Sequence, residues 1–222
     1  MKKTLLAVLF AAVGTILFVG FGSISNAREM SFTERYLSDA ENVATTMKSG
    51  TFDIDPNHSS VGFKVRHMGL AFVPGFFNKF TGAIMLDSED VTNSSVDVSI
   101  DVASVDTRVE GRNKHLRSAD FFDVEKFPTM TFKSKKVAKS GDKLKVTGDF
   151  TMKGVTKEVV MMVDLLPTKT VRGTEMLGAM GTTMIKRSEF GVNYGVENGM
   201  IGDDVEIEIN VEAKAKSEQP KP

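Results

Sequence analysis

The chain has 222 residues, enough for one domain of ordinary size or two very small ones. Its composition, 41% hydrophobic and 26% charged, is that of a globular protein. The absence of cysteine excludes disulfides, thiolate nucleophiles and thiolate metal sites, and a formal net charge of −1 gives no indication of a nucleic-acid partner.

The first 27 residues have the pattern of a secretory signal peptide. Two lysines precede a long apolar run, and Ser25 and Ala27 supply the small residues of a cleavage site. We expect cleavage before Arg28. The apolar run is also long enough to act as an uncleaved membrane anchor. With either outcome, the rest of the chain is expected outside the cytoplasm.

Residues 28–49 are interpreted as a helical segment and linker ahead of the main domain. Ser31 and Glu34 have the spacing of a capping box, and apolar residues recur at helical intervals as far as Met47. At the other end of the chain, the polar residues 217–222 are expected to form a disordered tail.

From Thr51 onward the hydrophobic period is two, which is typical of strands with one buried face. Short turns join these runs and no regular βαβ alternation occurs, so the sheet is predicted to be antiparallel, as a barrel or a sandwich. Recurrent glycine and alanine within the runs favour a barrel of about eight strands, which leaves room for one small ligand. The expected strands lie near residues 60–67, 76–87, 96–102, 129–138, 144–150, 156–166, 176–186 and 205–211.

One charged stretch, Thr107 to Asp123, resembles an active site at first sight but has the spacing of a helix. Thr107 and Glu110 are three residues apart, as in a capping box, so we expect a short helix beginning near Arg108. Leu116 and the valine seven residues before it would then face the barrel.

No catalytic or metal site is predicted. The sequence has no G-x-S-x-G elbow, no phosphate-binding G-x-x-x-x-G-K-[ST] loop and no H-E-x-x-H motif. Its three histidines, His58, His67 and His115, lack the local spacing of zinc ligands. A Ser-His-Asp triad stays open, because triads are recognised by geometry, but nothing singles out one serine.

The segment "HMGLAFVPGFFNKF", from His67 to Phe80, is interpreted as an unusually apolar connection between strands. It either closes one barrel end as a plug or forms the portal of an apolar cavity, and the residues alone favour neither. His67 ends the apolar face of the preceding strand. It is either the polar tip of the cavity or a rim histidine in contact with water.

Four ordered blocks resemble the YceI-like family: "FDIDPNHSSVGFKVRHMG", "SVDTRVEGRNKHLRSADFFDVEKFPTMTFKS", "VTGDFTMKGVTKEV" and "KRSEFGV". The resemblance covers about residues 50–214. It implies a lipocalin-like extended antiparallel barrel, here assigned to residues 50–216, in a periplasmic protein. It also implies an elongated cavity for a long-chain amphiphile such as a polyisoprenoid, a quinone or a fatty-acid derivative, with no catalysis and no cofactor. Asn113 stands where relatives commonly carry Asp, and Gly178-Ala179 where a larger aromatic is frequent, which would widen the pocket.

On this basis we predict a lipid-binding barrel, with no nucleic-acid partner and with transient membrane contact allowed. The alternatives are an enzyme acting on the bound lipid, which would place His67 or His115 beside a carboxylate in the cavity, and an envelope interaction module with a solid core. The predicted ligand-binding residues are Phe63, Val65, His67, Phe80, Met130, Phe132, Met161 and Val163 as lining, with Phe72, Phe76 and Phe77 at the portal.

Overall fold

The computed structural model describes residues 47–216. The predicted signal peptide, almost all of the N-terminal helical segment and the C-terminal tail therefore lie outside the described residues. The strands are β1 (Gly50–Ile54), β2 (Ser60–His67), β3 (Ala71–Phe77), β4 (Phe80–Leu86), β5 (Ser95–Asp101), β6 (Val105–Asp106), β7 (Thr129–Ser140), β8 (Lys143–Met152), β9 (Val155–Leu165), β10 (Lys169–Val171), β11 (Thr174–Lys186) and β12 (Ile201–Ala215). The helices are α2 (Glu110–Arg117) and the 3-10 turns η1 (Val91–Asn93), η2 (Val102–Ser104) and η3 (Arg187–Phe190).

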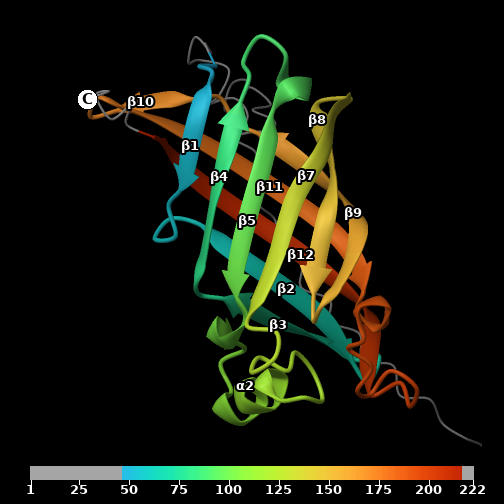
Figure 1. The fold of residues 1–222 in the computed structure, drawn as a ribbon. Coiled ribbons are helices and arrows are strands. Elements are labelled where there is room, and N and C mark those ends of the chain that lie inside the picture. The colour runs from blue at the N-terminus through green and yellow to red at the C-terminus, as the bar shows by residue number, and fades with distance from the viewer. Residues whose placement is uncertain (1–46, 217–222) are drawn as a thin grey trace, which may run out of the picture. The chain divides into compact units, whose positions relative to one another are not determined.

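Eight strands close an antiparallel barrel, as the sequence predicted (Figure 1). Around the ring the order is β1, β4, β5, β7, β8, β9, β11 and β12, and β12 returns to pair with β1. Most ring strands alternate inward apolar side chains with outward polar ones, because successive residues of a strand point to opposite faces, although β9 also has the exposed Val160 on its outer face. The expected barrel is therefore confirmed, and the sandwich is excluded.

Beyond the closed ring, β2, β3 and β6 extend the wall at one end. β12 pairs with β2 over residues 201–210 and with β1 only over its last residues, 213–215. β3 then pairs with β2, and the two-residue β6 pairs with β3. The turn between β2 and β3, helix α2 and the loop 191–200 lie at this end, which we call the helical end (Figure 1). The opposite end is the β10 end.

The prediction of an apolar connection between His67 and Phe80 is wrong for most of these residues. Residues 71–77 form the strand β3, and only the turn from His67 to Leu70 separates it from β2. Pro74 suggested a break, but β3 pairs with β6 only at its last two residues, so this proline lies on a largely free edge where a missing N–H does no harm.

The helix is confirmed, but its predicted capping box is wrong. α2 begins at Glu110, two residues later than expected, and its N-cap Val109 makes no side-chain capping bond. The hydroxyl of Thr107 instead donates to Oδ1 of the buried Asn113, at 2.7 Å, and accepts from Nε of Arg112, at 2.8 Å. Thr107 therefore ties the strand end to the interior of the helix.

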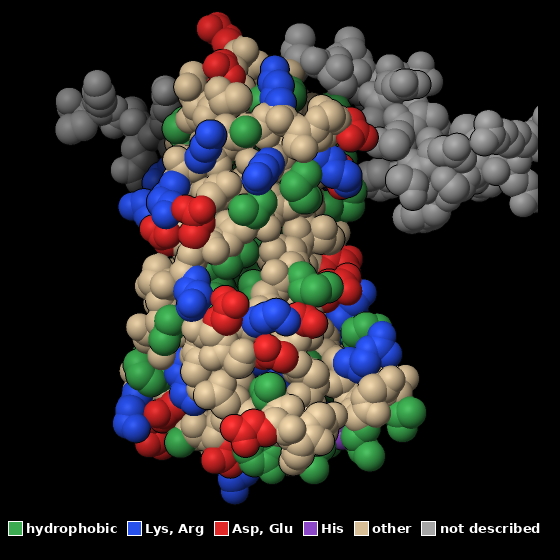
Figure 2. Space-filling model, turned by 90° about the vertical axis from the view of Figure 1, so that its right-hand side faces the viewer, with side chains coloured by type: hydrophobic (Ala, Val, Ile, Leu, Met, Phe, Trp, Pro, Cys, Tyr) green, Lys and Arg blue, Asp and Glu red, His purple; other side chains and the backbone are tan. Residues whose placement is uncertain are grey.

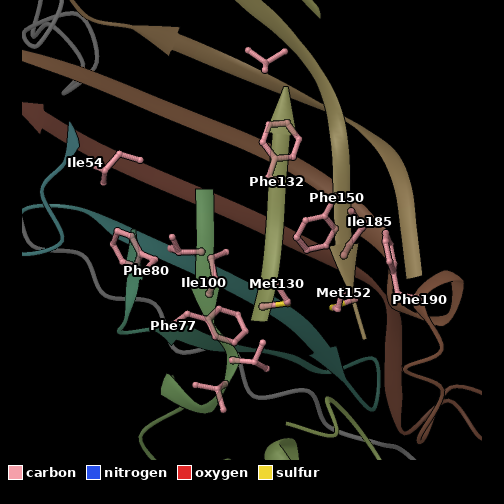
Figure 3. Packing of buried hydrophobic residues seen from close by; sticks show 14 of the residues in the cluster. Ile54, Phe77, Phe80, Ile100, Met130, Phe132, Phe150, Met152, Ile185 and Phe190 are labelled. Carbon is pink, nitrogen blue, oxygen red and sulfur yellow. The ribbon is translucent and has the colours of Figure 1, made fainter. Parts of the chain in front are cut away.

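The core is a continuous set of phenylalanine, aliphatic and methionine side chains inside the barrel (Figure 3). Glycines within the strands leave space that these core side chains fill, so the glycines do not serve a ligand alone. A Cβ on Gly148 would stand 2.6 Å from the ring of Phe132, and one on Gly178 would stand 2.9 Å from Leu166. The space at Gly178 is thus filled by Leu166, whereas Ala179 is the residue that lines the interior.

Candidate ligand cavity

The barrel encloses a cavity of about 430 Å³ at the helical end. A second cavity, of about 130 Å³, lies deeper toward the β10 end. Both are lined by the same four side chains, which therefore mark the neck between them: Val61, Ile100, Phe150 and Ile207. The two cavities together form an elongated interior space, so the barrel does not have the solid core that an interaction module would require.

The walls of this space are apolar because every contributing strand turns its hydrophobic face inward. β2 and β12 supply Phe63, Val65, Val205 and Ile207 to the larger cavity, and neighbouring strands supply Met130, Phe150, Met152 and Ile185. Figure 3 shows several of these side chains, Met130, Phe150, Met152 and Ile185, inside the barrel. Such a surface favours hydrocarbon over water.

The deeper cavity has three hydroxyl residues in its wall, Ser94, Ser95 and Thr183, and the larger cavity has the remaining polar groups, at the helical end. They come from the rim of β2, from the corner before α2, from α2 itself and from the segment after β11: His67, Thr107, Arg112, His115, Arg187 and Tyr194. A long apolar space with a few polar groups at one end is the arrangement that holds an amphiphile with its head group at the mouth.

The charged side chain of Arg187 has a structural role. Its side chain is buried, and its guanidinium donates to the carbonyl oxygens of Val192, Ile201 and Gly202 at 2.8, 2.9 and 2.8 Å. Burial lowers the pKa of Arg187, and the nearby Asp203 carboxylate opposes that shift. These bonds fix the loop 191–200 against β12.

Arg112 is a second cation in the wall of the larger cavity, and it forms no ion pair with a carboxylate within the described part of the chain. It is half-buried, with Nε and Nη2 bonded to the hydroxyl and carbonyl oxygens of Thr107 at 2.8 and 2.7 Å. The remaining N–H groups of Arg112 are available to a ligand at the cavity mouth.

His115 lies at the cavity beside a carboxylate, which is the feature that the enzyme alternative required. Its Nε2 is 2.8 Å from Oδ2 of Asp120, and its ring packs edge-on against Phe121 and Tyr194 with centroids 4.9 Å away. However, the side chains of His115 and Asp120 are 41% and 56% exposed. The His115–Asp120 pair is therefore exposed to water, unlike a catalytic base held in an active site that excludes water.

The structure brings most of the predicted lining residues together. Phe63, Val65, His67, Phe77 and Met130 line the larger cavity, and Phe132, Met161 and Val163 line the deeper one. His67 is at the rim, exposed to solvent and also in contact with the cavity. Whether these residues touch a ligand remains a prediction.

Three predicted phenylalanines lie elsewhere. Phe72 and Phe76 are 48% and 40% exposed on the outer face of β3, because they alternate with the inward-facing residues of that strand. Phe76 covers Gly62 from outside, and Phe72 packs under the guanidinium of Arg66. Phe80 is buried in the core but belongs to neither cavity wall.

Sequence reasoning missed the contributions of α2 and of the segments that follow β11. Leu116 lines the cavity as expected for the inner face of the helix, whereas Val109, which was expected beside it, is 49% exposed. Arg187 stands in the block "KRSEFGV", but its role depends on carbonyl groups that the sequence does not display. The missed wall residues include Thr107, Arg112, Phe121, Phe122, Val192, Tyr194, Met200 and Ile201.

The three histidines do not converge on a metal site. His58 pairs with Asp55 at 2.8 Å near the start of β2, His115 pairs with Asp120, and His67 is at the rim. Asp55, His58 and Glu212 do cluster, but Lys214 already contacts the Asp55 carboxylate at 2.5 Å. A cation would have to displace that lysine.

The fold is thus a closed lipocalin-like β-barrel with an apolar interior. The sequence model of the YceI-like domain family matches residues 52–213. A UPF0312 protein of Vibrio cholerae is 34% identical over 218 residues, covering 97% of this chain and 100% of the relative. A UPF0312 protein of Photorhabdus laumondii is 35% identical over 161 residues, covering 72% and 83%. The chain belongs to the YceI-like family.

Solved structures agree with this assignment. The YCEI protein of Campylobacter jejuni is 33% identical with a TM-score of 0.63, covering 69% of this chain and 91% of that one. BcnA of Burkholderia cenocepacia is 29% identical with a TM-score of 0.64, covering 72% and 99%. A polyisoprenoid-binding domain of Saccharophagus degradans shares the fold at 17% identity and a TM-score of 0.59, covering 76% and 100%. Within residues 47–216, no helix is long and apolar enough to cross a membrane.

Proposed function

We propose that this protein is exported to the periplasm and binds a long-chain amphiphilic lipid, namely a polyisoprenoid, an isoprenoid quinone or a fatty-acid derivative. The observation that carries the proposal is the elongated apolar interior, whose charged and histidine side chains, among the described residues, lie at the helical end. The likeness to a domain described as polyisoprenoid-binding supports the same ligand class. The N-terminal pattern of a signal peptide supports export.

Burial of the lipid chain would supply most of the affinity, at about 0.8 kcal/mol for each buried CH₂ group. The polar groups at the helical end would orient the head group. The protein is proposed as a carrier or a store and not as an enzyme, because the one histidine–carboxylate pair found at the cavity among residues 47–216 is exposed to solvent.

The proposal is tested by purifying the protein from an envelope fraction, extracting it with organic solvent and identifying the extract by mass spectrometry. A long-chain lipid at near-stoichiometric amount is expected. A protein that emerges empty, and whose melting temperature is not raised by added isoprenoids or fatty acids, would overturn the proposal.

A matched pair of variants locates the site. Val65→Asn places an amide in the wall of the larger cavity, whereas Val171→Asn makes the same change at an exposed position of the β10 end. Val65→Asn is expected to retain several-fold less lipid, with circular dichroism unchanged, and Val171→Asn to retain as much as the wild type. Equal retention by the two variants would argue against an interior site.

A further inference from the structure

The turn between β2 and β3 exposes large apolar side chains where a polar turn would be expected. Met68 is 59% exposed and Leu70 is 82% exposed. The turn is closed by the N–H of Leu70, which donates to the carbonyl of His67 at 2.9 Å. Met68 and Gly69 both have positive φ, of 51° and 71°, as in the type I′ turns that favour Asn-Gly.

Methionine is a poor choice for this backbone conformation, because a side chain with φ in the left-handed region is strained unless it is short and polar. The turns at Lys153-Gly154 and Arg172-Gly173 have similar positive φ values with cationic side chains, so the turn at Met68 is set apart by its exposed apolar side chains. Departures of this kind from local preference are expected at functional positions.

Two further apolar side chains lie at the same end. The N–H of Met68 donates to the carbonyl of Met200 at 2.9 Å, and Met200 and Tyr194 are each 44% exposed. Met200 and Tyr194 also line the larger cavity, so an exposed apolar surface continues into the interior of the barrel. We call Met68, Leu70, Tyr194 and Met200 the apolar tip. Figure 2 shows hydrophobic side chains gathered with a histidine at the lower right of the molecule.

Cations flank the apolar tip. The guanidinium of Arg66 lies 4.1 Å above the ring of the exposed Phe72 and bonds to the carbonyl of Gly69, with no carboxylate partner among the described residues. Lys64, also near Phe72, is paired with Glu206 at 2.8 Å. Arg112 at the cavity mouth has no acidic partner in the described region either. Glu197 is the exposed acid in the loop that carries Met200.

We propose that the helical end docks on an anionic lipid bilayer, with the apolar tip among the head groups and Arg66 against lipid phosphates. The proposal rests on the proposed lipid-binding function, because docking would let a lipid chain pass between bilayer and cavity without crossing water. Flexible apolar side chains beside a long basic one suit the membrane interface, where the apolar part inserts and the charge stays at head-group level.

A bilayer fits the apolar tip better than a second protein does. Stable protein interfaces bury roughly 800 Å² on each partner. A four-residue tip at the end of a hairpin falls short of such an area, whereas interfacial insertion requires only that a few side chains reach the head-group region. The uncovered cavity beside the tip also matches a partner that supplies the ligand.

The test is co-sedimentation of the purified protein with vesicles of phosphatidylcholine alone or mixed with phosphatidylglycerol. The double variant Met68→Asn with Leu70→Asn removes the two most exposed side chains of the apolar tip while keeping a turn sequence that tolerates positive φ. Binding to mixed vesicles is expected to fall by about tenfold or more, since two large apolar side chains no longer insert. Arg66→Gln should weaken binding to mixed vesicles and leave binding to neutral vesicles unchanged. Val171→Asn, at the β10 end, should bind as the wild type does.

All proteins are prepared with the same N-terminus, so any contribution of residues 1–27 is common to them. Wild-type binding by the double variant, or a concentration-dependent dimer that the double variant abolishes, would overturn membrane docking. Lipid extraction from the same samples separates this outcome from failure of the proposed function. If the protein retains lipid but does not bind vesicles, only the docking proposal is refuted. If the protein carries no lipid, the proposed lipid-binding function is refuted.

Discussion

Two glycines of the helical end, Gly75 and Gly111, differ in how closely other atoms pack around them. A Cβ on Gly75 would overlap the ring of Phe63 and stand 2.9 Å from Cγ2 of Thr107. Among the described residues, no atom outside its own helix and chain neighbours lies within 4 Å of a Cβ on Gly111. Gly75 therefore fixes the position of a cavity-lining ring, whereas Gly111 lowers the stability of α2 and leaves open space at the wall of the larger cavity.

We expect Gly75→Ala to lower the free energy of unfolding by about 1–3 kcal/mol, because the Phe63 ring must move out of its place. Gly111→Ala is expected to raise it by about 0.5–1 kcal/mol, since alanine is the better helix former. Urea unfolding of both variants measures the difference. If the two alanines had effects of the same sign and size, the close packing of Phe63 on Gly75 would be refuted.

Asp55 makes the fold sensitive to acid. The Lys214 ammonium at 2.5 Å, the His58 ring at 2.8 Å and the Asn57 N–H at 3.0 Å hold the pKa of Asp55 well below its usual range. A carboxyl with a lowered folded pKa contributes stability that is complete above the unfolded pKa of about 4 and is lost as the pH falls toward the folded value.

Asp55→Asn should therefore destabilise the protein at neutral pH, and its unfolding free energy should depend less steeply on pH below about 4 than that of the wild type. The measurement is a series of urea unfolding curves between neutral pH and the acid limit of solubility. Parallel pH profiles for the two proteins would show that Asp55 does not carry the acid sensitivity.

At the scale of elements, the corner between β6 and α2 depends on one buried amide. Oδ1 of Asn113 accepts from the N–H and the hydroxyl of Thr107 at 2.8 and 2.7 Å, and its Nδ2 donates to Oδ1 of Asp106 at 3.0 Å. These bonds hold α2 at the cavity, where Arg112 and Leu116 contribute to the wall.

Asn113→Ala leaves the buried N–H of Thr107 without its acceptor, so we expect a loss of about 1–3 kcal/mol in unfolding free energy. The neighbouring Lys114→Ala, on the exposed side of the helix, should change stability by less than about 0.5 kcal/mol. Amide hydrogen exchange should also show faster exchange across α2 in Asn113→Ala alone. Unchanged protection of α2 would mean that other contacts hold the helix.

The period-two pattern predicts most of the ring strands because they have one polar and one apolar face, and that property is local. β3 was misjudged because its proline is harmful only where both edges are paired, and edge pairing is decided by distant segments. The capping box at Thr107 failed for a different reason, since Asn113, six residues later and inside the helix, accepts the hydrogen bond of the hydroxyl. Much of the cavity wall could be anticipated from strand alternation, but the loop 191–200 could not, because its position depends on the carbonyl contacts of Arg187.

At the scale of the whole molecule, the neck between the two cavities sets the length of chain that the barrel can hold. Ile207 lines both cavities and is only partly buried, so it faces open space along the barrel axis. A larger side chain at this position would narrow the passage while leaving the mouth and the outer surface as they are.

Ile207→Phe is expected to shift the retained lipids toward shorter chains, because the deeper cavity becomes inaccessible. Mass spectrometry of solvent extracts measures the chain-length distribution, with Ile207→Leu as the volume-conserving control. An unchanged distribution in Ile207→Phe, with the protein folded, would show that ligands do not reach past the neck.

The fifteen-residue β12 pairs with β1, β2 and β11, so the last strand of the barrel joins the first strands to the late ones. The ring of described strands cannot close until β12 has paired, and its pairings span most of the sequence. Folding of this kind, dominated by distant pairings, is slow. A chain in which β12 has not yet paired would present its cavity-lining strands as an open, apolar sheet. Folding therefore passes through a stage that is vulnerable to aggregation. The strand that closes the ring is the last of the described strands in the sequence.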